Sequence, residues 1–218
     1  MPHLTSLIIG LGLLAIFPAA ADGVSQERPA DLLMHHLSLI EELEAFYSQK
    51  TDDDRVSHQH GRFWLRQPGQ FRIQPADDMS PLLVSDGIDL WEFDALLEQV
   101  VVQPVSLDPT VSPVLLLADP ELDLEAHYEV ALYRDDLEEV FALSPLREDA
   151  FFRNLSLHFR DGLPVRIGVF VVSGQYLEMD IKVIEHPRAF PVSLFQFDAP
   201  DGVDVIDCSS GGMAGGSI

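Results

Sequence analysis

The feature that most constrains the fold of this chain is a succession of short alternating runs, divided by turn residues, from Gly61 onward. Runs of this kind around Pro-Gly, Asp-Gly and Ser-Gly dipeptides are typical of β-hairpins. The pattern predicts about ten strands joined as one antiparallel meander. They lie near residues 61–66, 70–75, 81–85, 88–93, 98–103, 127–133, 137–143, 152–159, 163–171 and 175–184.

A sheet of this length is expected to curl, because strands twist and because a flat open sheet exposes its faces and edges. We therefore predict a mainly β chain with some helices (α+β), built on a curled antiparallel sheet. Such a sheet encloses more volume than its own side chains fill, as ligand-holding barrels do. Either helices or a ligand must occupy the remaining space.

Two segments predict helices. Residues 30–49 form one apolar stripe at helical spacing, which is typical of an amphipathic helix. The members of the stripe are Leu32, Leu33, Leu37, Ile40, Leu43 and Tyr47. Residues 112–119, SPVLLLAD, offer Ser112 as a cap and Pro113 for the first turn. This second helix is apolar nearly all round, so we expect it to act as a lid against apolar surface.

The N-terminal segment predicts export. Its first 21 residues contain no Asp, Glu, Lys or Arg, and the apolar run from Leu7 to Phe17 precedes a proline and three alanines. A membrane span needs about 20 apolar residues, so this run is short for one. We predict a signal peptide over 1–21, cleaved near Ala21, with an uncleaved anchor as the alternative. One domain over 22–208 and a disordered Gly/Ser-rich tail over 209–218 are expected to follow.

Charge and cysteine content narrow the partners and the compartment. The chain carries 13 Lys and Arg against 36 Asp and Glu, a net charge of −23. Such a field repels phosphate backbones, so we expect no nucleic-acid partner. Cys208 is the single cysteine, which excludes a disulfide within the chain and a lipid on an N-terminal cysteine. A periplasmic protein with a solubilising acidic surface fits these features.

The sequence shows little sign of catalysis. It contains no GxSxG, HExxH, CxxC, P-loop or GxGxxG motif. One acidic and histidine-rich cluster offers ligands for a divalent metal, but its spacing matches no known site, and a polar loop leading into a strand is the simpler interpretation. The cluster consists of Asp52, Asp53, Asp54, His58 and His60. We therefore predict no enzyme activity, no cofactor and no metal site.

The aromatic residues are more informative. They are spread along successive predicted strands, in a number that exceeds what one face of a sheet would show to water. The set comprises Phe63, Trp64, Phe71, Trp91, Phe93, Phe151, Phe152, Phe159 and Phe170. Some must fill the core, but a wide apolar concavity accounts better for the set as a whole.

Several segments carry a resemblance to a known family. GRFWLRQPGQFRI, PLLVSDGIDLWEFDALLEQVVVQPV, SPVLLLAD and FQFDAPDGVDVID resemble, in this order, the motifs of the periplasmic outer-membrane lipoprotein carrier family, LolA. Leu43, Ala45, Tyr47 and Gln49 also fall where the family has F-x-A-x-F-x-Q. The resemblance covers residues 30–206, and the motifs are specific as a set.

The resemblance implies an unclosed β-barrel under a helical lid, whose apolar interior holds lipoprotein acyl chains. It implies a periplasmic carrier that receives outer-membrane lipoproteins from an inner-membrane lipoprotein-releasing ABC transporter and passes them to an outer-membrane lipoprotein receptor. A monomer suits such a shuttle. The residues expected to line the cavity are Phe63, Leu65, Phe71, Ile73, Trp91 and Phe93, and those expected in the lid are Leu37, Ile40, Val114, Leu115 and Leu117.

The residues before Pro68 depart from the family pattern. In the family, an arginine directly before the proline is thought to bond to lid backbone groups and hold the cavity shut. Here Gln67 takes that place and Arg66 stands one residue earlier, which in a strand turns its side chain to the other face. Arg66 acts as the latch if a bulge re-aims it. Alternatively Gln67 bonds to the lid with an uncharged amide, and closure is then less favoured.

Two other functions remain open from the sequence. One is a sensor of the same fold that binds lipids or lipoproteins without transporting them. The other is a metal-dependent hydrolase that uses the cluster between Asp52 and His60.

Overall fold

The computed structural model describes residues 27–51, 59–77, 79–105, 114–119, 121–184 and 189–208. In these ranges the helices are α1 (Pro29–Ser38), α2 (Val114–Ala118), α3 (Leu124–His127) and the 3-10 helix η1 (Val192–Phe195). The first strands are β1 (Glu42–Thr51), β2 (Gln59–Arg66), β3 (Gln70–Pro75), β4 (Leu82–Asp86), β5 (Asp89–Asp94) and β6 (Gln99–Pro104). The later strands are β7 (Tyr128–Arg134), β8 (Glu139–Pro145), β9 (Phe152–Arg160), β10 (Leu163–Val171), β11 (Tyr176–Val183) and β12 (Asp204–Asp207).

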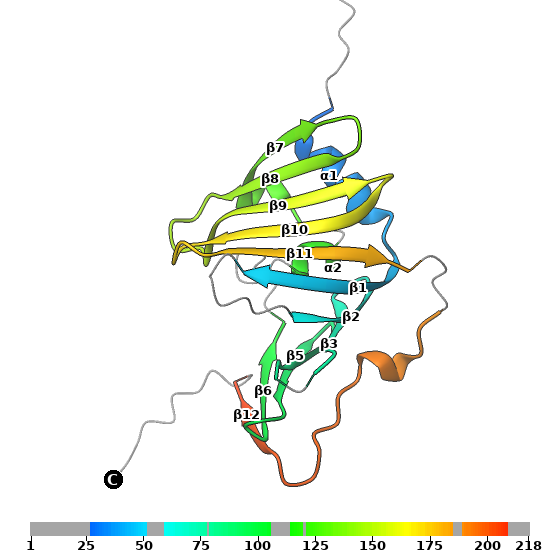
Figure 1. Cartoon of the computed structure of the whole chain (residues 1–218), viewed down its shortest axis with the longest axis vertical. Coiled ribbons are helices and arrows are strands. Elements are labelled where there is room, and N and C mark those ends of the chain that lie inside the picture. The colour runs from blue at the N-terminus through cyan, green and yellow to red at the C-terminus, as the bar shows by residue number, and fades with distance from the viewer. Residues whose placement is uncertain are drawn as a thin grey trace, which may run out of the picture.

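All twelve of these strands belong to one sheet, in the order β12-β6-β5-β4-β3-β2-β1-β11-β10-β9-β8-β7. The sheet is two meanders, β1–β6 and β7–β11, joined where β1 pairs with β11. In Figure 1 strands β7–β11 run across the view, whereas β5, β6 and β12 run steeply, because the sheet twists along its length. Strands β7 and β12 stand at opposite ends of this order, so the sheet does not close into a barrel.

The predicted helix over 30–49 is wrong in its second half. Helix α1 ends at Ser38, and β1 follows from Glu42. In β1 the buried residues Leu43, Ala45 and Tyr47 alternate with more exposed neighbours, which is the two-residue period of a half-buried strand. Leu43 and Tyr47 also satisfy a four-residue helical spacing, so the apolar pattern alone fits both structures. Pairing with β2 on one side and β11 on the other decides in favour of the strand.

The C-terminal region also differs from the prediction. Strand β12 was not predicted, and it pairs with β6 in parallel rather than antiparallel register. Because β12 follows a long connection from β11, its direction is set by the path of that connection and not by a hairpin. The helix predicted over 112–119 corresponds to α2, whereas its expected cap residues Ser112 and Pro113 lie outside the described residues, as do the segments 1–21 and 209–218.

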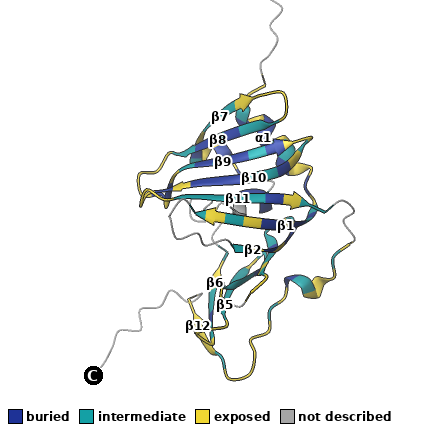
Figure 2. Cartoon of the chain, in the orientation of Figure 1, coloured by how far each residue is buried: buried dark blue, intermediate teal, exposed yellow. Residues whose placement is uncertain are grey.

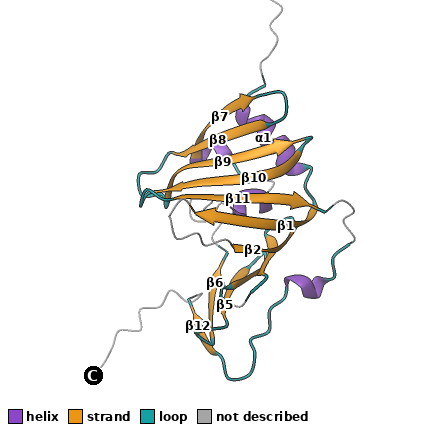
Figure 3. Ribbon diagram, viewed as in Figure 1, coloured by secondary structure: helices purple, strands orange, loops and turns teal. Residues whose placement is uncertain are grey.

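Helices α1 and α2 lie on one face of the sheet, here called the inner face, and together they form the lid (Figure 3). Their buried leucines share one core with the inward side chains of the strands. The largest fully buried members of this core include Leu33, Leu37, Leu65, Phe71, Leu116, Leu117, Phe141, Phe152 and Phe159. Figure 2 shows burial concentrated along β8–β10, while β12 is exposed. The core therefore lies between the lid and the β7–β11 half, and it continues beneath β1–β3.

The opposite, outer face is contacted by residues 190–197, which belong to a C-terminal segment, 189–208, here called the C-terminal strap. Strap residues contact the outward-facing side chains of the strands, which alternate with the inward-facing ones. The ring of Phe197 lies 5.8 Å from that of Phe93, and Arg72 donates to the carbonyl of Leu194. Burial lowers the pKa of Arg72. The lid thus covers the inner face at β2, whereas the strap contacts outward side chains of β2, β3 and β5.

Candidate functional site

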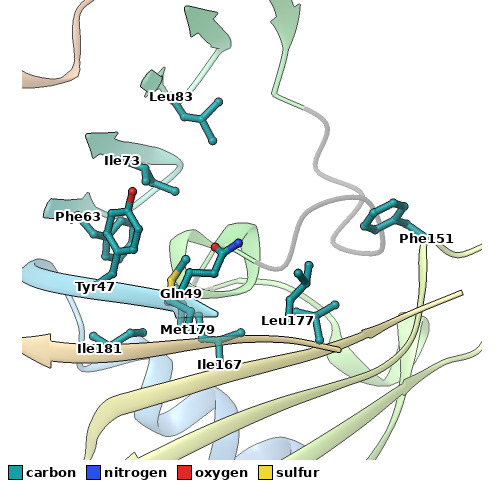
Figure 4. Close-up of a pocket in the computed structure, with 12 residues that line it drawn as sticks. Tyr47, Gln49, Phe63, Ile73, Leu83, Phe151, Ile167, Leu177, Met179 and Ile181 are labelled. Carbon is teal, nitrogen blue, oxygen red and sulfur yellow. The ribbon is translucent and has the colours of Figure 1, made fainter. Parts of the chain in front are cut away.

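A cavity of about 190 Å³ lies on the inner face, between the sheet and helix α2 (Figure 4). Ten of its twelve lining side chains are hydrocarbon or thioether groups, and none of the twelve is charged. The lining residues are Tyr47, Gln49, Phe63, Ile73, Leu83, Leu117, Phe151, Ile167, Val169, Leu177, Met179 and Ile181. The wall therefore offers dispersion contacts to an apolar group and almost no charge or polarity.

Strand register explains how residues far apart in sequence come to share this wall. Ala45, Phe63, Ile73 and Leu83 are successive partners across β1–β4, so their side chains stand in one row on the inner face. On the other side of β1, Ile181 pairs with Tyr47, and the inward residues of β11 continue the wall into β10. The cavity thus spans the seam between the two meanders.

Gly61 makes room for the ring of Tyr47. The two residues are direct partners in the β1–β2 ladder. A Cβ atom at Gly61 would lie 2.9 Å from Cε1 of Tyr47 and 2.2 Å from the carbonyl oxygen of Gln74, which is closer than real contacts allow. The absence of a side chain at Gly61 therefore lets the tyrosine lie across β2. Burial, with a smaller contribution from the charge of Asp77, raises the pKa of Tyr47, so its hydroxyl stays protonated at neutral pH.

The predicted cavity residues divide into three groups. Phe63 and Ile73 line the cavity. Leu65 and Phe71 stand on the same inner face, but they are fully buried in the core with the lid and contribute nothing to the cavity wall.

The prediction that Trp91 and Phe93 line the cavity is wrong. Ser85 pairs with Leu90 and Leu83 pairs with Glu92, so the inward residues of β5 are Leu90 and Glu92. Trp91 and Phe93 therefore point to the outer face, and Phe93 packs against the strap. Alternation places the two aromatic residues on one face together, but only pairing with β4 determines which face that is.

The predicted lid residues are placed as follows. Leu37 and Ile40 are buried in the core on and just after α1, and Leu117 on α2 is both fully buried and part of the cavity wall. Val114 and Leu115 belong to α2, but their side chains lie outside what the structure describes. Side chains from both helices thus fill part of the hollow that the sheet forms.

Gln67 connects the lid to the sheet. Its Nε2 donates to the carbonyl of Leu37 at 3.0 Å and to the carbonyl of Leu117 at 2.9 Å. One uncharged amide thereby bridges α1 and α2. The backbone N–H of Gly69 adds a bond to the carbonyl of Ala118 at 2.8 Å. Of the two alternatives for the latch, these contacts belong to Gln67.

Arg66 points to the other face of the sheet. Its Nε donates to Glu42 at 2.7 Å, its Nη2 donates to the carbonyl of Phe190, and its guanidinium lies 4.9 Å from the ring centroid of Phe195. No bulge turns it inward, since β2 and β3 pair without a register shift from Gly61 to Arg66. The alternative that Arg66 contacts the lid is therefore wrong, and the residue holds the strap instead.

The metal-ligand cluster can be compared with the structure only at its end. His60 lies on β2, whereas Asp52, Asp53, Asp54 and His58 fall outside the described residues. Within the described ranges, no group of three or more His, Cys, Asp or Glu residues is arranged to hold a metal ion. No helix in the same ranges is long and apolar enough to cross a membrane.

Sequence reasoning missed most of the cavity wall. Tyr47 and Gln49 were assigned to a helix, and the inward residues of β10 and β11, such as Ile167 and Met179, were not singled out. The signal for Tyr47 was present in the alternation of Leu43, Ala45 and Tyr47. No local signal indicates that β11 pairs with β1, because that contact joins opposite ends of the chain.

The open sheet, with a helical lid over an apolar hollow, defines the class of unclosed barrels that enclose an apolar cavity. Within that class, the family model described as "Outer membrane lipoprotein carrier protein LolA" matches residues 38–198. The chain belongs to this family.

Individual relatives agree with this assignment. The chain is 31% identical over 204 residues to an outer-membrane lipoprotein carrier protein of Chromohalobacter salexigens, covering 92% of this chain and 95% of the relative. It is 30% identical over 203 residues to the protein of the same name from Azotobacter vinelandii, covering 92% and 96%. An uncharacterized conserved protein of Thermus thermophilus shares the fold, with a TM-score of 0.52, 12% identity and coverage of 83% and 99%.

Proposed function

We propose that this protein is a periplasmic carrier that binds the acyl chains of outer-membrane lipoproteins in the cavity under its lid. The observation that carries the proposal is an uncharged, almost wholly apolar cavity whose cover is fastened to the sheet by one amide side chain. The names of the relatives, outer-membrane lipoprotein carrier protein, support the choice of cargo.

The size of the cavity supports a cycle of opening and closing. A cavity of about 150 Å³ in another protein binds benzene. The present cavity, at about 190 Å³, therefore suits a short stretch of alkyl chain and is too small for several whole acyl chains. For a full load, the lid must leave the hollow that Leu117 and its neighbours fill.

The burial of apolar surface would drive both the loading and the release of the cargo. Three acyl chains of about 16 carbons remove dozens of CH₂ groups from water, and at about 0.8 kcal/mol for each group the gross gain is tens of kcal/mol. Release requires that the empty protein gain something by closing. The lid provides this gain, because its leucines replace the acyl chains against the same wall.

The proposal includes the surroundings of the carrier. Residues 22–208 form the working domain after the signal peptide is removed near Ala21. The cargo comes from an inner-membrane releasing complex of the ABC type and goes to a receptor on the outer membrane. The protein acts as a monomer, without catalysis and without a cofactor.

The test is release of lipoproteins from spheroplasts into the soluble fraction, with two neighbouring residues of β4 compared. Leu83 lines the cavity, whereas Leu82 faces outward, and both are half-buried. Leu83→Asp places a charge among apolar groups and should abolish most of the lipoprotein release. Leu82→Asp should leave the release near the wild-type level. Full release by the Leu83 variant would contradict the proposal, and release without transfer to outer-membrane vesicles would indicate a sensor.

A further inference from the structure

Two polar side chains interrupt the otherwise apolar cavity wall. Tyr47 and Gln49 stand on the inner face of β1, and Ser48 between them points outward. The exposed fraction of Tyr47 is only 5%. Among the described residues, neither the tyrosine hydroxyl nor the glutamine amide makes a hydrogen bond, and Gln49 is only half-buried. In Figure 4 both side chains rise from β1 toward the space enclosed by Leu83, Leu177 and Phe151.

Both polar groups remain open to a partner. The Tyr47 hydroxyl is not among the buried, unpartnered polar atoms of the described residues, and Gln49 is only half-buried, so both groups face the cavity with their hydrogen-bonding capacity unused. The tyrosine ring is positioned by packing, because Gly61 leaves room for it and no hydrogen bond is needed to orient it. The hydroxyl is thus held ready for a partner that enters with the ligand.

The spacing of the two groups favours a ligand with two acceptors. Residues two apart on a strand stand about 7 Å apart on one face, and both side chains can lean toward each other from that distance. The protonated hydroxyl of Tyr47 donates a hydrogen bond, and the amide of Gln49 donates from its nitrogen. Together they offer two neutral donors at one end of a hydrocarbon wall.

The charge around the cavity selects neutral acceptors. No Lys or Arg is among the lining residues, and Asp77 lies close enough to affect Tyr47 electrostatically. The net charge of −23 adds a repulsive field. A fatty-acid carboxylate or a phosphate would enter this site without a cation to receive it, whereas an ester carbonyl carries no charge and needs only a donor.

We propose that Tyr47 and Gln49 bind the ester carbonyl oxygens of a diacylated glyceryl group, while its alkyl chains lie along the apolar wall. This inference deepens the proposed function and rests on it. The polar pair then fixes how far the acylated end of the cargo enters the cavity. It also distinguishes ester-linked lipid from hydrocarbon of equal length, which the apolar wall alone cannot do.

The test compares two ligands that differ only in the carbonyl groups. Dioctanoylglycerol and the ether-linked dioctylglycerol are each titrated against the full-length mature protein loaded with the apolar dye N-phenylnaphthylamine, and displacement of the dye is measured. One neutral hydrogen bond contributes about 1 kcal/mol, or about fivefold in affinity. We therefore expect the wild type to prefer the ester, and Tyr47→Phe and Gln49→Leu each to reduce the ratio of ester affinity to ether affinity about fivefold.

Ser48→Ala is the matched control, because this residue lies between the two on the outer face, and it should keep the full preference. Thermal unfolding of each variant shows whether the fold is intact. If the variants lose ester and ether affinity equally, or lose neither, the polar pair does not recognise carbonyl groups, although the carrier function stands. If neither ligand displaces the dye from the wild type, the proposed function fails, and this inference fails with it.

Discussion

The two covers of the sheet are fastened by neighbouring residues with opposite chemistry. The lid is held on the inner face by Gln67, an uncharged amide that donates to one carbonyl of each helix region. The strap is held on the outer face by Arg66, which is ion-paired with Glu42 of β1 and contacts the strap through the carbonyl of Phe190 and the ring of Phe195. Two adjacent residues thus fasten two different covers. The lid closes over a cavity, whereas the strap closes over packed aromatic side chains.

The different chemistry of the two fastenings means that the lid and the strap are held with different strength. Hydrogen bonds in which one partner is charged are roughly twice as strong as neutral ones, and a guanidinium stacked on an aromatic ring adds further stabilisation. Neutral bonds to the lid make its release less costly. The fold thus places its weaker fastening where the proposed function needs movement, and its stronger one where the structure needs support.

The largest expected effect comes from breaking the outer fastening. Arg66→Ala removes all three contacts and should lower the free energy of unfolding by about 2–3 kcal/mol, because the guanidinium is mostly buried and leaves Glu42 and the Phe190 carbonyl without their donor. Urea unfolding measures this loss. Arg62→Ala is the control, since Arg62 pairs with Glu44 and lies over Trp64 on the same face. Equal losses for both variants would show that the strap contacts of Arg66 are not special.

A smaller effect on stability, and a clearer one on binding, should follow from changing the inner fastening. Gln67→Leu leaves the carbonyls of Leu37 and Leu117 without their donor and should cost about 1–2 kcal/mol. The lid then opens more often, so an apolar dye should enter the cavity about fivefold faster in stopped-flow measurements.

The opposite change sharpens the comparison. Gln67→Arg supplies a charged donor and should slow entry of the dye. Gln70→Leu provides the control, because the amide of Gln70 also donates to a backbone carbonyl, but to that of Asp86 in β4 and not to one of the lid. An unchanged entry rate in both Gln67 variants would mean that this side chain does not restrain the lid.

The smallest effect concerns the contact between α1 and β8. The His36 ring stacks on Phe159 at 5.0 Å, and its Nε2 lies 2.6 Å from Glu139. Burial alone would raise the pKa of Glu139, but hydrogen bonds with Arg134 and His36 outweigh it and lower the pKa below its ordinary 4.5. A carboxyl with a lowered folded-state pKa stabilises the fold above its ordinary pKa, and this contribution is lost as the pH falls through the lowered value.

Glu139→Gln should therefore lower the unfolding midpoint at pH 7, by an amount corresponding to about 1 kcal/mol. The difference from the wild type should shrink as the pH falls below 4.5. Thermal unfolding across this pH range tests the expectation, and Glu129→Gln, at an exposed position of β7, serves as the control. A difference that persists unchanged at low pH would attribute the effect of Glu139 to packing instead of charge.

Much of the sheet could be predicted from local signals, since Asp-Gly and similar dipeptides divide strands regardless of what surrounds them. The helical lid and the family also followed from residues that lie close together in sequence. What could not be predicted depends on long-range pairing. Trp91 and Phe93 were placed on the wrong face, because register with β4 decides their orientation. The strand nature of residues 42–51 depends on neighbours from both ends of the chain.

The latch shows the same limit on a smaller scale. The sequence left Arg66 and Gln67 as alternatives, because alternation says only that adjacent side chains face opposite sides. Unbroken pairing of β2 with β3 carries Arg66 to the outer face, and Gln67, just past the end of β2, reaches the lid.

The pairing of β1 with β11 has a consequence for the folding of the molecule. Seven residue pairs form this ladder, from Ala45 with Val183 to Thr51 with Leu177, so every contact in it spans more than a hundred residues. Each meander is able to assemble from local hairpins, but the ladder that joins them must wait for nearly the whole polypeptide. The cavity straddles that ladder, so the candidate site cannot form until this long-range pairing is in place.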